Sequence, residues 1–62
     1  MSKDKNANII LQSCLKAGMP VRLSERDGKF ICIVEQKWIT AEADLLADAI
    51  LEACSKAILG ES

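Results

Sequence analysis

The sequence predicts a small α+β domain in which a β-hairpin lies between two helices, giving the order αββα. Three observations predict this fold. Apolar residues recur at helical spacing near the N-terminus, an Asp-Gly pair separates two β-rich runs, and a long segment with a wide apolar side fills the C-terminal third. No repeat or linker interrupts the chain, so we expect residues 1–62 to form one domain.

The first helix is predicted over about residues 4–17. Asp4 or Asn6 can cap its start, and Gly18 followed by Pro20 can end it. The apolar residues that share one face at the spacing i, i+3, i+4 and i+7 are Ala7, Ile10, Leu11, Cys14 and Leu15.

A β-hairpin is predicted next, with strands over about residues 20–25 and about residues 29–35. Asp27-Gly28 can form a two-residue turn, which places Leu23 opposite Cys32. A loop that is one residue longer, with a bulge at the glycine, would shift the pairing by one step and exchange the two faces. Both registers remain open, and in both the second strand carries large apolar side chains on its two faces.

The second helix is predicted over about residues 41–59, with Thr40 as its N-cap and Gly60 at its end. Its apolar residues cover roughly half of the circumference, which is more than one buried face requires. Alanines recur at every fourth position, a spacing that lets another backbone approach closely. A polar stripe on the same helix contains Asp44, Asp48 and Glu52.

The apolar side chains on the second face of the hairpin remain exposed to water if both helices pack on the first face. Burying each large apolar side chain contributes about 1.5–3 kcal/mol, and an isolated two-stranded ribbon is marginal in water. A homodimer that pairs its ribbons is the favoured solution. Helices that straddle the ribbon, or a different protein partner, are the alternatives. The residues predicted for a dimer or partner interface are Ile31, Ile33, Trp38, Ala49 and Ala53.

The sequence argues against catalysis. It contains no histidine and no tyrosine, so acid–base work would fall to carboxylates, lysines or thiols. Cys14, Cys32 and Cys54 are widely separated, form no CxxC pair and lie in apolar contexts, which indicates buried, reduced thiols. We expect no enzyme activity, no metal and no cofactor.

The charge distribution is uneven although the net charge is only −1. Residues 1–40 carry seven cations against four acids, a net of +3, and residues 41–62 carry one against five, a net of −4. Nucleic-acid binding by a basic hairpin is therefore the alternative function, in a dimer that doubles its cations. The isoelectric point near 5.2 argues against this alternative, because DNA-binding domains of this kind usually have a high isoelectric point. The cations concerned are Arg22, Arg26, Lys29 and Lys37.

The function predicted first is a small, non-enzymatic protein–protein interaction module. Compact chains of this size are typical of phage or mobile-element accessory proteins that bind and block a host complex, such as a defence or nucleic-acid-processing complex. The expected contacts are the acidic stripe and the hairpin tip, which contains Arg26, Asp27 and Lys29. The polar N-terminal segment has no apolar core of a signal peptide, and no window is apolar enough for a membrane span, so we expect a cytoplasmic protein without membrane contact.

Overall fold

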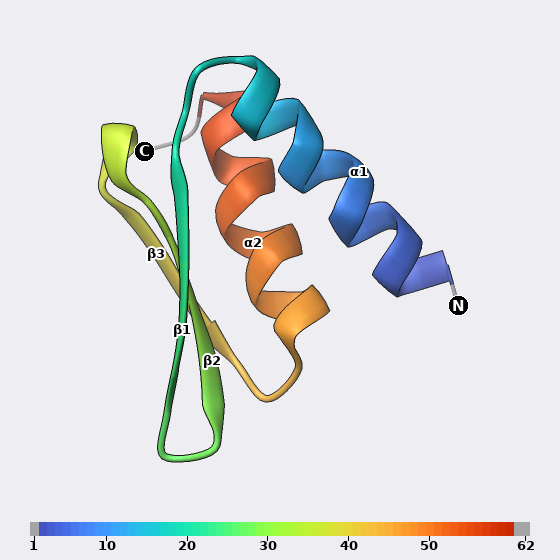
Figure 1. Cartoon of the computed structure of the whole chain (residues 1–62), viewed down its shortest axis with the longest axis vertical. Helices are drawn as coiled ribbons and strands as arrows, with labels where there is room; N and C mark the ends of the chain where they lie inside the picture. The colour runs from blue at the N-terminus through green and yellow to red at the C-terminus, as the bar shows by residue number, and fades with distance from the viewer. Residues whose placement is uncertain (1, 61–62) are drawn as a thin grey trace.

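A computed structural model of the chain describes residues 2–60 as two helices and a three-stranded antiparallel sheet (Figure 1). The α+β class and the order helix, hairpin, helix are confirmed, and a third strand is added to the hairpin. The elements are α1 (Ser2–Lys16), β1 (Val21–Arg26), β2 (Lys29–Val34), a short 3-10 helix η1 (Glu35–Lys37), β3 (Ile39–Ala43) and α2 (Leu46–Leu59).

The third strand corrects the predicted start of the second helix. Thr40 lies within β3, and the N-cap of α2 is Leu45, which makes no side-chain capping hydrogen bond. The chain turns back after β2 because η1 ends at Trp38, whose backbone is left-handed with φ 56°. Residues 39–43 therefore run beside β2, and their alternating burial replaces the helical continuation that the sequence predicted.

The first of the two hairpin registers is the observed one. Asp27 and Gly28 both have positive φ, 53° and 79°, which matches the right-handed twist of the flanking strands in a two-residue turn. Arg26 then pairs with Lys29 and Leu23 with Cys32. The side chains of β2 that face the helices are Phe30, Cys32 and Val34, whereas Ile31 and Ile33 face away from them.

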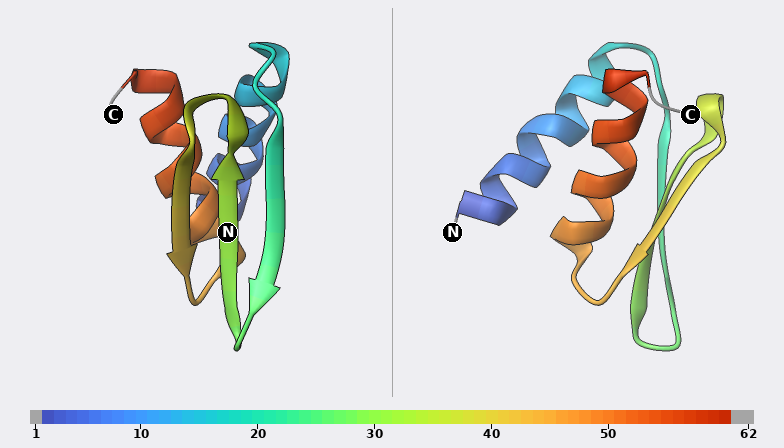
Figure 2. Two further views of the ribbon diagram at one scale, coloured as in Figure 1. Left: turned by 90° about the vertical axis from the view of Figure 1, so that its left-hand side faces the viewer. Right: turned by 180° about the vertical axis from the view of Figure 1, so that it is seen from behind.

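Both helices lie on one face of the sheet (Figure 2). Helix α2 packs against β2 and β3. Helix α1 packs mainly against α2 and diverges from the sheet toward its N-terminus, so it barely touches β1 (Figure 1). As a result β1, at the edge of the sheet, is the strand that the helices cover least.

The core is built from small side chains, mainly alanine and cysteine. Ala49 and Ala53 are completely buried, so the prediction that they form a dimer or partner interface is wrong. The close approach that these alanines permit occurs inside the chain, where α2 packs against α1 and the sheet.

Candidate partner-binding site

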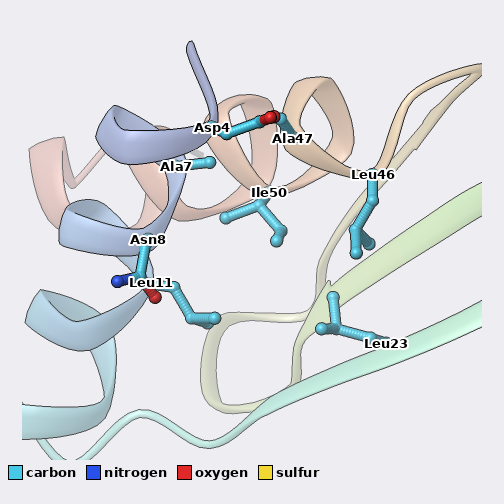
Figure 3. A pocket seen from close by; sticks show the side chains of 8 residues that line it. All are labelled: Asp4, Ala7, Asn8, Leu11, Leu23, Leu46, Ala47 and Ile50. Carbon is cyan, nitrogen blue, oxygen red and sulfur yellow. The ribbon is translucent and has the colours of Figure 1, made fainter. Parts of the chain in front are cut away.

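The divergence of α1 from β1 leaves a groove of about 330 Å³ between α1, β1 and the start of α2 (Figure 3). Figure 3 shows Leu11 from α1, Leu23 from β1 and Leu46 from α2 extending toward this common space. Leu23, on the helix-facing side of the sheet, is 41% exposed. Leu46, the first residue of α2, is 39% exposed. The lining residues are Asp4, Ala7, Asn8, Leu11, Leu23, Leu46, Ala47 and Ile50.

The groove is apolar with one charged member. Asp4 is an acid on the first turn of α1, and Asn8 follows it one turn later. The remaining lining residues are leucine, isoleucine or alanine. A surface with this composition gains free energy from burying an apolar side chain and repels a negative charge at its margin.

Sequence reasoning did not find this groove. The sequence places Leu11 on the apolar face of the first helix, and in one register it places Leu23 opposite Cys32. Nothing in local periodicity brings three leucines from three elements together, because the groove depends on the angle between α1 and the sheet. One signal was available in the adjacent leucines at 45 and 46, which form the N-cap and the first residue of α2.

The predicted acidic stripe does not exist as one helical face, because Asp44 lies in the turn before α2. Lys29 Nζ donates a hydrogen bond to Asp44 Oδ1 at 2.8 Å. This bond, together with the charge of Asp44, raises the pKa of Lys29, and the same bond lowers the pKa of Asp44. Asp44 is therefore engaged by a cation of its own chain.

The other two acids of the stripe also have cations beside them. Lys3 Nζ lies 3.0 Å from Asp48 Oδ1, which joins α1 to α2. Lys56 Nζ lies 3.8 Å from Glu52 Oε2, one turn away on the same helix. These pairs are exposed and contribute little to stability, but they reduce the negative field that a basic partner would meet.

Two of the basic residues on the hairpin are paired in the same way. Arg22 Nη2 lies 3.0 Å from Glu35 Oε2, and Lys29 Nζ forms the ion pair with Asp44 described above. Arg26 and Asp27 remain exposed at the hairpin tip. The pairs weaken the case for a basic hairpin that binds nucleic acid.

The far side of the sheet carries the other predicted interface residues. Ile31 and Ile33 are half-buried, and their cross-strand neighbours are polar: Ser24 and Glu42 beside Ile31, Arg22 and Thr40 beside Ile33. Their use as an interface stays a prediction.

Trp38 is 83% exposed at the end of η1. Its large ring is available to a partner at this position, and its predicted role in an interface also stays a prediction.

The three cysteines are buried and unpaired, as predicted. The Cys14 thiol donates a weak hydrogen bond to the Cys54 carbonyl oxygen at 3.7 Å. Burial raises the pKa of the Cys32 thiol and that of the Cys54 thiol, so both stay protonated at neutral pH. Thiols in this state are poor nucleophiles and poor metal ligands.

Within residues 2–60, no group of three or more cysteines and acids is placed to hold a metal ion. Neither α1 nor α2 combines the length and the apolar content that crossing a membrane requires. Comparison with protein-family models, with curated proteins and with solved structures found no match.

Proposed function

We propose that this chain is a non-enzymatic protein-binding module whose contact surface is the groove between α1, β1 and α2. The observation that carries the proposal is an apolar groove left open in a chain that buries alanines and cysteines completely. A partner side chain that fills the groove would gain about 1.5–3 kcal/mol from burial alone.

The surroundings of the groove support a protein partner. Leu45, which precedes the lining residue Leu46 in the sequence, is a second large apolar residue in this region and is 54% exposed. Contiguous exposed apolar surface is typical of interaction sites. The identity of the partner as a host complex, blocked by a mobile-element protein, stays a prediction from size and architecture. Phage genes beside the gene for this chain would support it, and ribosomal or metabolic genes would contradict it.

The proposal is tested by photo-crosslinking from inside the groove. A chain of this length is accessible to chemical synthesis, so Leu46 can be replaced by photo-leucine, which keeps the shape of the side chain. Photo-leucine at Leu15 is the matched control, because Leu15 is 46% exposed on α1 and does not line the groove. We expect an adduct with one protein in extracts of the cells that express the chain, formed from position 46 and not from position 15.

A second pair of variants shows whether the adduct depends on the groove. Leu23→Asn removes an apolar wall of the groove and should abolish the adduct, whereas Ile9→Asn, at a residue 55% exposed outside the groove, should leave it intact. Adducts of equal yield from both photo-leucine positions, or none from position 46, would reject the groove as the contact surface.

A further inference from the structure

The free edge of the sheet lies beside the groove. In an antiparallel pair, hydrogen-bonded residue pairs alternate with pairs that are not bonded. Glu35 N donates to Pro20 O at 3.4 Å, so the bonded pairs on this side of β2 contain residues 20, 22, 24 and 26. The N–H and C=O groups of Val21, Leu23 and Glu25 therefore point away from β2, and no strand within residues 2–60 pairs with them.

Leu23 belongs to both features. Its backbone groups lie on the free edge of β1, and its side chain lines the groove (Figure 3). A strand added to this edge would direct every second side chain to the groove side of the sheet. Strand addition of this kind obtains affinity from main-chain hydrogen bonds and specificity from pockets for alternate side chains.

The edge of β3 differs in this respect. Thr40 and Glu42 offer their backbone groups there, but α2 packs over the helix-facing side of β3, where Ala41 is buried. A strand at that edge would lie beside α2 and not beside the groove lined by Leu23. The two edges thus form a natural pair for comparison.

The charges around β1 define the chemistry of the added strand. Glu25 lies two residues from Leu23 on the groove side, and Asp4 lines the groove. Arg22 and Arg26 lie on the opposite face of β1. Cross-strand pairs of opposite charge stabilise a sheet, and like charges destabilise it. A fitting strand therefore carries an apolar residue opposite Leu23, a basic residue opposite Glu25 and acidic residues opposite the two arginines.

A second copy of this chain fits the edge less well. Antiparallel pairing of two β1 edges about residue 22 places Arg22 opposite the partner's Arg22, and pairing about residue 24 places Arg22 opposite the partner's Arg26. Pairing about residue 25 opposes two glutamates. Pairing about Leu23 avoids like charges, but it sets Val21 against the partner's Glu25, which gives no complementary pair.

We propose that an extended segment of a different protein adds to the free edge of β1 as a fourth strand and inserts an apolar side chain into the groove. This inference rests on the proposed function and specifies its binding mode. The segment has an apolar residue flanked by one basic position on the groove side and by acidic positions on the other side.

The proposal is tested with a defined peptide, Glu-Lys-Thr-Leu-Glu-Val. In antiparallel pairing its residues lie opposite positions 26 to 21 in turn, so its lysine faces Glu25 and its leucine faces Leu23. Titrated into isotope-labelled protein and followed by NMR, it should shift the amide signals of Leu23 and Glu25 and the methyl signals of Leu46 and Ile50. The charge-exchanged peptide Lys-Glu-Thr-Leu-Lys-Val should bind about tenfold more weakly, because three complementary pairs become repulsive.

A backbone change separates strand addition from simple occupation of the groove. N-methylation of the Leu23 amide removes a donor from the free edge and leaves the bonds to β2 intact. N-methylation of Glu42 on the edge of β3 is the matched control. We expect the first change to abolish peptide binding and the second to leave it unchanged, with folding of both checked by circular dichroism. Intermolecular nuclear Overhauser effects between the peptide and the Leu23 and Glu25 backbone protons give the same test without modifying the chain.

Three results would overturn the inference. Shifts confined to the groove methyl groups, without backbone contacts to β1, would show an apolar groove that binds no strand. Absence of peptide binding in a protein that still forms the Leu46 adduct would also show that the groove binds no strand. In both cases the proposed function would survive. A dimer that dissociates on N-methylation of Leu23 would identify a second copy as the occupant. Loss of the Leu46 adduct itself would instead reject the proposed function.

Discussion

At the scale of the residue, this chain forms its core from side chains smaller than those of most cores. Cys14, Cys32 and Cys54 are each completely buried and act as small hydrophobes. Their burial was predictable from apolar context and wide spacing. The burial of Ala49 and Ala53 was not, because alanine at every fourth position fits an interface with a partner and an interface within the chain equally well.

The buried thiols predict a pH dependence of stability. Burial raises the pKa of Cys32 and that of Cys54 above the ordinary value of 9.0, so the folded chain keeps protons that the unfolded chain loses. The free energy of unfolding is therefore unaffected by these groups below about pH 8 and falls above pH 9, by at most about 1.4 kcal/mol per pH unit for each thiol. Urea denaturation at pH 7 and pH 10 measures the fall.

The control for this prediction is a pair of variants. Cys54→Ala removes one thiol and should reduce the slope above pH 9. Lys29→Arg keeps the pair with Asp44 charged at high pH and should leave the contribution of the thiols in place. Identical unfolding free energies at pH 7 and pH 10 in the native chain would contradict the assignment.

At the scale of the element, local signals predicted the first helix and the hairpin well and β3 not at all. Gly18 with Pro20 ended the helix, and Asp27 with Gly28 formed the turn where expected. The segment 39–43 contains alanine and glutamate, which favour helices, and Thr40 resembles a cap. Pairing with β2 overrides these preferences. A strand of five residues contains too few repeats of the two-residue alternation for the sequence to reveal it.

The corrected helix start makes a prediction about capping. Leu45 has the extended backbone of an N-cap but no side-chain oxygen, so Leu45→Ser should raise the free energy of unfolding by about 1 kcal/mol. Thr40→Ala should cost less than the loss of a cap, because Thr40 is exposed in a strand. Chemical denaturation of both variants measures the changes in the free energy of unfolding. A loss of about 1 kcal/mol for Thr40→Ala, with no gain for Leu45→Ser, would restore Thr40 as the cap.

At the scale of the whole molecule, the sequence predicted more apolar surface than the chain covers, but placed it on the second face of the hairpin and on the second helix, and not between α1 and β1. Part of that surface, on α2, is covered by α1 and the sheet. The groove that remains depends on how α1 leans away from β1, an angle set by the packing of α1 on α2 that no single element encodes. A second copy seated in the groove and the heterologous strand proposed for β1 make opposite predictions about whether this groove is open in the free protein.

The most direct test of a binding surface between α1 and β1 is the accessibility of the groove in solution. A soluble nitroxide should broaden the NMR methyl signals of Leu23 and Leu46 strongly and spare those of Val34, which is completely buried. An open groove should give this contrast at every protein concentration. Methyl groups of Leu23 and Leu46 that are protected when concentrated and exposed on dilution would show that a second copy fills the groove. Protection at all concentrations would show that α1 closes onto β1 and that no binding surface exists there.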